Sequence, residues 1–378
     1  MFIYSAIAIG CILFIYTAWR IIWPLPLRWW WRILLCIPLA MGAFRYPLLY
    51  SIYGGHFFRP DCPAWVELSC TWLFMALLLL LAGLMVVELL FLLPGLIWRH
   101  NRKLRKLKSM LCCMTLPVAL GTAAWGMYNA FALPEVREIS IHLPKLRETV
   151  RLAMLTDLHA DRYKQAEFFH EVVKRTNALQ ADAIVITGDF QDGHLYSLAP
   201  ALAPLRHLKS RWGTYAVHGN HDYFSEHQAW ERYLSSLGIR FLNNEHLLPG
   251  PGHLVLAGIT DPAARRDNAL PPDLSQTLAG APADKPIILL AHQPRIAEKA
   301  AGHSIALQLS GHTHGGQMPG LRQLIALFNQ GLVQGLYRRG NMQIYISNAT
   351  ALWSGFPIRL FTPAEITLIN LLPEHENK

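Results

Sequence analysis

The feature that most constrains the fold is the uneven distribution of apolar residues along the chain. Of the 378 residues, 52% are hydrophobic and only 16% are charged, and the long apolar runs stop before about residue 134. Runs of about 20 apolar residues match the thickness of a bilayer's hydrocarbon core. The sequence therefore predicts a transmembrane domain over residues 1–133 and a soluble domain over residues 134–378.

The transmembrane domain is predicted to be an α-helical bundle of about four spans. No positive charge precedes the first apolar run, which favours an uncleaved span over a signal peptide. Trp29, Trp30 and Trp31 precede the second run, and their rings suit the headgroup layer. The predicted spans cover residues 2–19, 33–53, 70–98 and 110–133.

Basic residues between the spans predict the orientation of the domain. The loops at residues 20–32 and 99–108 are basic, whereas the loop between the second and third spans carries only Arg59, offset by Asp61. Positively charged loops stay on the cytoplasmic side of a membrane. Both termini and the whole soluble domain are therefore predicted to lie on the outer side.

The net charge limits the possible partners, and the positions of the cysteines limit disulfides and thiolate metal sites. A net charge of +9 could indicate binding to nucleic acid or to an anionic membrane. The clear basic cluster lies in the predicted loop at 99–108, however, and topology-setting loops explain the charge without nucleic acid. All six cysteines lie at or before Cys113, so the soluble domain is predicted to have neither a disulfide nor a thiolate metal site.

Two charged residues, Arg45 and Glu88, interrupt the predicted spans. Charges inside a membrane are costly and often functional, so both could line a polar cavity or bind a lipid headgroup. Alternatively, Arg45 extends to the interface and Glu88 pairs with another helix. The sequence leaves these alternatives open.

After residue 134, short apolar segments alternate with polar, helix-like ones, which predicts an α/β domain. The apolar segments are rich in Val, Ile and Leu, as is typical of buried strands. Residues 166–179 have apolar positions at helical spacing, and residues 262–284 are typical of a loop-rich excursion or a short helix. The predicted strands cover residues 151–156, 184–187, 214–217, 254–259, 286–291, 305–309 and 344–346.

Polar clusters follow five of these predicted strands. Carboxyl ends of consecutive strands meet at one edge of a sheet, which is where α/β proteins place their sites. Carboxylates and imidazoles that converge there are ligands for divalent metal ions. The clusters, in chain order, are Asp157-Leu-His159, Gly188-Asp189, Gly219-Asn220-His221-Asp222, His292 and Gly311-His312-Thr313-His314.

This ordered set resembles the calcineurin-like metallophosphoesterases over roughly residues 137–372. The fuller signature Gly-His-Thr-His-Gly-Gly-Gln at residues 311–317 is similar to a membrane-associated bacterial branch of that superfamily. The resemblance implies a four-layer α-β-β-α sandwich, a bacterial inner membrane and metal-dependent phosphoester hydrolysis. The chain departs from the family's pattern at residues 347–350, where Ser-Asn-Ala-Thr replaces an expected glycine-rich turn. This difference affects the expected shape of the substrate pocket and not the metal ligands.

The resemblance implies two divalent metal ions. Mixed His, Asp and Asn ligands suit Mn²⁺, Fe or Zn better than calcium. Asp189 would bridge the two ions, and a hydroxide bridging them would attack phosphorus in line. The first ion would be held by Asp157, His159 and His314, and the second by Asn220, His292 and His312.

The predicted catalytic residues are His221 and Asp222. His221 is expected to stabilise or protonate the leaving oxygen, with Asp222 holding the imidazole in orientation. Arg162 and His194 lie near motif loops and could contact substrate. The remaining histidines considered are expected to be structural: His170, His218, His253 and His303.

The predicted function is therefore a membrane-anchored phosphohydrolase. A domain tethered beside a bilayer meets lipids at high effective concentration, which favours a lipid-linked phosphorylated substrate. Monoester, diester and pyrophosphate substrates remain open. One alternative is a nuclease, but the chain lacks the interleaved aromatic and basic residues of a strand-binding groove. The other is a non-catalytic sensor or transport-associated protein with a relic metal domain.

Overall fold

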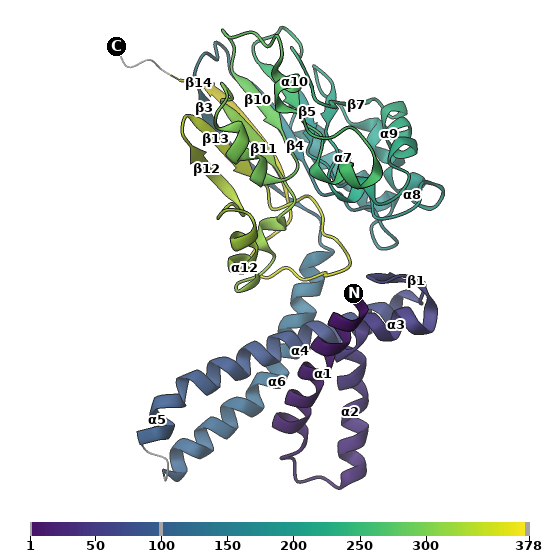
Figure 1. Cartoon of the computed structure of the whole chain (residues 1–378), viewed down its shortest axis with the longest axis vertical. Coiled ribbons are helices and arrows are strands. Elements are labelled where there is room, and N and C mark those ends of the chain that lie inside the picture. The colour runs from purple at the N-terminus through teal and green to yellow at the C-terminus, as the bar shows by residue number, and fades with distance from the viewer. Residues whose placement is uncertain (1, 98–100, 375–378) are drawn as a thin grey trace. The chain divides into compact units, whose positions relative to one another are not determined.

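The computed structural model describes residues 2–97 and 101–374 and divides the chain into two compact units (Figure 1). One unit comprises Met1–Asn129 with Gly355–Ile358, and the other comprises Ala130–Ser354 with Arg359–Lys378. Residue 98, the predicted end of the third span, and residue 99, the predicted start of the basic loop, lie outside the described residues. Each unit is described separately below.

The N-terminal unit is built from apolar helices. Three helical segments are long and apolar enough to cross a membrane, namely Ile3–Ile22, Ala64–Leu90 and Arg102–Ala130. A bent pair of helices provides a fourth candidate. In chain order the elements are α1 (Phe2–Thr17), the π-helical η1 (Ala18–Ile22), α2 (Trp29–Ala43), α3 (Arg45–Tyr53), β1 (Gly55–His56), β2 (Arg59–Pro60), α4 (Ala64–Leu90), α5 (Leu92–Ile97) and α6 (Arg102–Ala130).

The second predicted span is bent and not continuous. Helices α2 and α3 meet at an angle of 83°. Pro47 lies in the first turn of α3 and has no N–H to continue the helical hydrogen bonds of α2. The 15 residues of α2 rise only about 22 Å, less than the roughly 30 Å hydrocarbon core. The described residues of the unit therefore contain three candidate spans, or four if the bent pair counts as one.

The two charges within the predicted spans have partners. Glu88 of α4 pairs with Arg20 of η1 and, at 2.6 Å, with Lys108 of α6. The alternative that Glu88 pairs with another helix is thus confirmed. Arg45 is buried, and its guanidinium lies 3.7 Å from the Glu67 carboxylate, so it has a carboxylate partner within the unit. Its extension to the membrane interface stays a prediction.

The second unit contains two six-stranded mixed sheets. Four parallel strands lie side by side in each sheet, and antiparallel pairs occur toward the edges. The first sheet has the order β3 (Glu135–Leu143), β14 (Glu365–Pro373), β4 (Val150–Leu155), β5 (Ala183–Ile186), β6 (Thr214–Ala216) and β7 (Ile239–Phe241). The second has the order β12 (Gly335–Arg339), β13 (Met342–Ile346), β11 (Leu307–Ser310), β10 (Ile287–Leu290), β9 (Val255–Gly258) and β8 (Glu245–Leu247).

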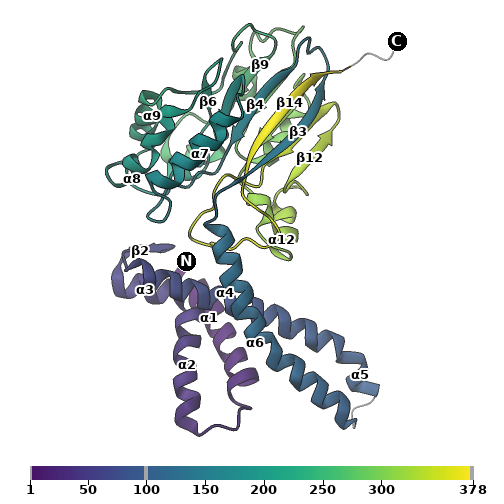
Figure 2. The same cartoon turned by 180° about the vertical axis from the view of Figure 1, so that it is seen from behind.

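Three large hydrophobic cores hold the described part of this unit together. One lies between the sheets and includes Met154, Val185 and Leu290. A second packs the other face of the first sheet against helices that Figure 2 shows over it. A third covers the second sheet. The predicted α/β fold is confirmed, with mixed sheets. The helices are α7 (Ala166–Ala178), α8 (Leu195–Leu202) and α9 (His227–Ser236) on the first sheet, with α10 (Leu274–Leu278), α11 (Ala297–Ala300) and α12 (Leu321–Phe328) elsewhere.

Short 3₁₀ turns complete the unit. They connect strands to helices or form parts of the loops after the strands. Within 262–284, η4 and α10 form the expected loop-rich excursion. The turns are η2 (Ala203–His207), η3 (His221–Tyr223), η4 (Pro262–Asp267), η5 (Pro294–Ile296) and η6 (His314–Gly316).

Candidate metal centre

The structure brings all seven predicted metal ligands together at one edge of the two sheets. Each ligand follows the carboxyl end of a parallel strand, so the strand ends of both sheets deliver side chains to a common region. Asp157 and His159 follow β4, Asp189 follows β5, Asn220 follows β6, His292 follows β10, and His312 and His314 follow β11.

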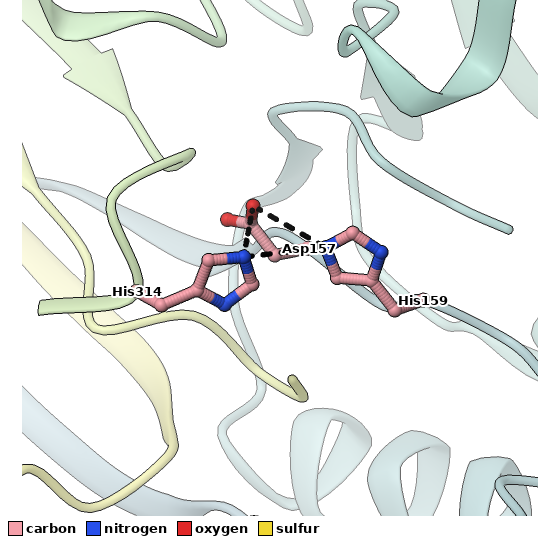
Figure 3. Close-up of side chains that lie close together, drawn as sticks. All are labelled: Asp157, His159 and His314. Carbon is pink, nitrogen blue, oxygen red and sulfur yellow. Dashed lines mark hydrogen bonds and ion pairs between the residues drawn. The ribbon is translucent and has the colours of Figure 1, made fainter. Parts of the chain in front are cut away.

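Asp157, His159 and His314 form the first cluster (Figure 3). One ligand atom from each lies within 4.8 Å of the others, and all three residues are buried. Nε2 of His314 is 3.5 Å from Asp157 Oδ1 and 3.3 Å from Nε2 of His159. Two imidazole nitrogens that face each other beside a buried carboxylate form a donor set suited to a divalent cation.

Asp189, His292 and His312 form the second cluster, also with ligand atoms within 4.8 Å of one another. Nε2 of His292 is 3.2 Å from Asp189 Oδ2 and 3.2 Å from Asn220 Oδ1. The same Asp189 oxygen is 3.6 Å from His159 Nε2, which belongs to the first cluster. Asp189 therefore lies where a shared carboxylate would have to lie.

Hydrogen bonds at the opposite ring nitrogens select the tautomer that metal binding requires. The Nδ1–H of His292 donates to the Thr187 carbonyl at 2.7 Å, which leaves the Nε2 lone pair facing the cluster. Nδ1 of His159 lies 3.1 Å from a carboxylate oxygen of Asp192 in the same arrangement. Such partners orient imidazole ligands and increase their basicity.

Asp192, and not Asp222, holds the imidazole of His221. Nδ1 of His221 lies 2.6 Å from Asp192 Oδ1, and the His221 ring packs edge-on against His159 with centroids 4.7 Å apart. The prediction that Asp222 orients His221 is therefore wrong. Asp192 could have been suspected from the sequence only through its position three residues after Asp189.

Asp222 instead connects two loops of the site through backbone hydrogen bonds. Its carboxylate accepts from the N–H groups of Asp189 at 2.9 Å, Phe190 at 2.8 Å and Gly219 at 2.7 Å. All three donors are main-chain groups, whereas the His221 ring bonds to Asp192. Its role in the structure is to fix the loop that carries Asp189 beside the loop that carries Asn220.

The pKa values of the two imidazoles in the second cluster are shifted in opposite directions. Burial lowers the pKa of His292, but the carboxylates of Asp189, Asp157 and Asp261 together outweigh burial and raise that pKa to about 10. Burial and the neighbouring His292 charge lower the pKa of His312 to about 3. In the metal-free chain, a proton on His292 thus compensates the buried carboxylates. A metal ion bound to both imidazoles would replace that proton.

The backbone at the ligands is strained. Asp157, Asp189 and His312 have φ of 52°, 56° and 71°, which is unusual for residues other than glycine. His159 at 41° and His314 at 49° share this conformation. Each such residue costs about 1–2 kcal/mol, and strain of this kind persists mainly at functional sites.

Two glycines allow the loops to approach the ligands closely. A Cβ at position 219 would overlap Asp189 Oδ1, and one at position 311 would overlap Thr156 Oγ1 and Asp157 Oδ2. The residues 347–350, where a glycine-rich turn was expected, contain Ala349 with φ of 77°. The turn therefore has the left-handed conformation that glycine favours, with alanine in that place.

A cavity of about 300 Å³ adjoins the second cluster. Arg295, three residues after His292, is exposed and lines it, so sequence reasoning missed a cation beside the site. Arg162 and His194 are not among its described lining residues; His194 lies 3.3 Å from Glu226. The lining consists of Asn220, Pro262, Ala263, Gln293, Arg295, His312, Phe328 and Asn329.

Known proteins share this domain. A sequence profile of the calcineurin-like phosphoesterases matches residues 150–316. An uncharacterized metallophosphoesterase of Helicobacter pylori strain J99 is 37% identical over 66% of this chain and 67% of its own. A transmembrane protein with metallophosphoesterase domain from Danio rerio is 33% identical over 90% of this chain and 80% of its own.

Among solved structures, the sulfate thiohydrolase SoxB of Thermus thermophilus aligns with a TM-score of 0.38 and 15% identity, over 58% of this chain and 56% of that one. The sequence relatives are much more similar, and they extend beyond the profile match on this chain. With strand-end carboxylates and imidazoles gathered as described, the chain belongs to the calcineurin-like phosphoesterase superfamily.

Proposed function

We propose that this protein is a membrane-anchored hydrolase of a phosphate ester or pyrophosphate, dependent on two divalent metal ions. The observation that carries the proposal is the position of Asp189, which belongs to the second cluster and also lies 3.6 Å from His159 of the first. A single cluster would suit one ion. Two clusters that share a carboxylate suit a dinuclear centre.

The donor set fits Mn²⁺, with Fe or Zn as alternatives. Asp157, His159 and His314 would hold one ion, and Asn220, His292 and His312 the other, with Asp189 shared. When bound, the ions would polarise the phosphoryl group and activate water for in-line attack. The imidazole tautomers fit this assignment, because His159 and His292 use Nδ1 for bonds inside the protein and keep Nε2 for the centre.

His221 is proposed to donate a proton to the leaving oxygen. Burial alone would lower the pKa of His221, but the Asp189 and Asp192 carboxylates raise it to about 9 in the metal-free chain. Asp192 occupies Nδ1, so Nε2 is the ring nitrogen that remains for the substrate. Arg295 at the cavity is placed to attract a phosphate, as a planar cation with several donors.

The substrate is proposed to be lipid-linked, and the catalytic domain to lie on the outer side of a bacterial inner membrane. We retain residues 1–133 as the membrane domain and 134–378 as the hydrolase domain. Glu88 joins the end of α4 to the end of η1 and the start of α6. The helices α1 and α4 therefore run in the same direction, which supports a return crossing by α2 and α3 and four spans in all.

Hydrolysis of bis(p-nitrophenyl) phosphate by the full-length protein tests the proposal. We expect release of p-nitrophenol that requires Mn²⁺, stops on chelation and is lost in Asp189→Ala. A control, Asp273→Ala, removes an exposed N-cap carboxylate of α10 and should leave the rate unchanged. The alternative of a relic domain without catalysis predicts no metal-dependent rate in any of these proteins.

A further inference from the structure

Helix α12 presents an apolar face that no described residue of its own domain covers. None of its eight residues is buried. Leu324, Leu327 and Phe328 are 49%, 79% and 75% exposed, and their i, i+3 and i+4 spacing places them on one face. Figures 1 and 2 show α12 at one end of the domain, clear of both sheets. Clustered large apolar side chains on a surface mark a binding site more often than single ones do.

The apolar face reaches the catalytic cavity. Phe328, at the end of α12, lines that cavity together with two predicted metal ligands, Asn220 and His312. Arg295 and Gln293 also line it. One end of the cavity therefore offers metal ligands and polar groups, and its rim continues into the exposed leucines of α12.

The charges around α12 favour an anionic amphiphile. The helix contains one charged residue, the exposed Arg322, and no acidic residue. Arg295 adds a second cation at the cavity. A ligand with a phosphate group and a long apolar chain would match this arrangement, since its phosphate suits the cavity and its chain suits the leucines.

We infer that the exposed face of α12 binds the acyl chain of an amphiphilic phosphoester whose phosphate occupies the metal centre. This inference rests on the proposed hydrolase function and specifies its substrate class. The chain's apolar helices would keep the domain near a bilayer, where acyl chains are the most abundant apolar partner. Leu324 and Leu327 select the chain, and Phe328 connects the face to the cavity.

The test compares two substrates that differ only in chain length. The methyl and dodecyl esters of p-nitrophenyl phosphate contain the same reacting bond and leaving group. The full-length protein is loaded with Mn²⁺ in nanodiscs of phosphatidylethanolamine and phosphatidylglycerol. It is compared with the double variant Leu324→Gln/Leu327→Gln. The matched control is Leu248→Gln, which changes a leucine that is 44% exposed and follows β8.

The wild type and the control should cleave the dodecyl ester with a kcat/KM about tenfold above that for the methyl ester. The double variant should lose most of this preference and retain the methyl-ester rate, which shows that it is folded. An unchanged preference in the double variant would overturn the inference and leave the hydrolase intact. An altered oligomeric state with the preference intact would assign the face to a second copy and also overturn it.

If the proposed function is wrong, the rates on the two esters show a different pattern. If the wild type cleaves neither ester with Mn²⁺, the hydrolase assignment and the inference are both overturned. Equal loss of both rates in the double variant would mean that α12 supports the metal centre structurally, which also contradicts an acyl-chain site.

Discussion

Charged groups are paired differently in the two units of this chain. In the N-terminal unit, Arg45 faces Glu67, and Glu88 faces two cations, so guanidinium or ammonium groups neutralise carboxylates directly. At the strand ends of the second unit, the carboxylates of Asp157 and Asp189 face imidazoles instead. Imidazoles are neutral at physiological pH unless a neighbour raises their pKa.

The difference indicates what each set of charges does. Arg and Lys keep their protons, so the pairs of the N-terminal unit are complete and hold helices together. A carboxylate and imidazole cluster can exchange its protons for a divalent cation, so its charge balance depends on a ligand. We infer that the first arrangement serves to hold helices together and that the second serves to bind a cation. Four changes test this distinction, and a fifth, Ala349→Gly, tests the strained turn. The four substitutions are ordered by decreasing effect.

His221→Ala should have the largest effect. Loss of a positioned proton donor typically reduces a rate by a factor of about 10²–10⁴, equivalent to about 3–5 kcal/mol of barrier. The side chain of His221 is predicted to be catalytic and not a ligand, so metal content measured by mass spectrometry should stay at the wild-type level. Loss of metal together with activity would instead make His221 a ligand.

Arg45→Met should be the most destabilising change in the N-terminal unit. It leaves the Glu67 carboxylate buried without its facing guanidinium, and breaking such a pair costs about 3–5 kcal/mol. The melting temperature of the full-length protein in detergent should fall, while its metal content should not. The double change Arg45→Met/Glu67→Met should recover much of the loss; no recovery would mean that the two charges are not coupled.

Asp192→Asn should have an intermediate effect on both metal binding and rate. Asp192 contacts Nδ1 of His159 and of His221, and loss of such a partner typically costs about 10–100-fold in metal affinity or activity. Competition with a chelator gives the affinity, and initial rates give the activity. A matched Asp182→Asn change, at a carboxylate that bonds the Arg151 N–H, should leave both values unchanged.

The metal-free protein should lose stability between about pH 6.5 and pH 9. Carboxylates raise the pKa of His221 to about 9 and of His292 to about 10, despite burial, so the folded state binds protons that the unfolded state has released. Each of these two histidines then lowers the free energy of unfolding by about 1.4 kcal/mol for every pH unit in that window. Melting temperatures should fall accordingly without metal and should fall less with Mn²⁺, because ligation requires a neutral His292. A flat metal-free profile would contradict this charge assignment.

Ala349→Gly should have the smallest effect and the opposite sign. Ala349 has φ of 77°, a conformation that costs alanine about 1 kcal/mol relative to glycine. Glycine also increases the entropy of the unfolded chain, so the net stabilisation should be below 1 kcal/mol. Chemical denaturation of the metal-loaded protein measures it. A clear loss of stability would show that the Ala349 methyl group makes contacts worth more than the strain.

Much of the second unit was predictable from sequence because its signals are local. Each predicted strand is present within two residues of its predicted ends, since runs of Val, Ile and Leu followed by Gly or Asp mark buried parallel strands. Parallel strands place their carboxyl ends together, which brought the predicted ligands to one edge. The edge strands β3, β7, β8 and β12 lacked such runs and were not predicted. The inner strand β14 was also not predicted, although it contains Ile366, Leu368 and Ile369.

The features that sequence reasoning missed depend on tertiary geometry. The sequence pointed to Asp222, the neighbour of His221, as its partner. Only the folded loops show that Asp222 faces backbone N–H groups and that Asp192 faces imidazoles. Arg295 joins the cavity because η5 follows His292 directly. The bend between α2 and α3 had a local signal in Pro47, which the apolar run concealed.

The most direct test of the account is the number of metal ions bound per full-length chain. The wild type is compared with Asp189→Asn and with Glu88→Gln, which makes the equivalent acid-to-amide change in the N-terminal unit. We predict about two ions per chain in the wild type and in Glu88→Gln, and fewer than one in Asp189→Asn. An unchanged count in Asp189→Asn, or fewer than one ion in the wild type, would contradict a dinuclear centre built on this carboxylate.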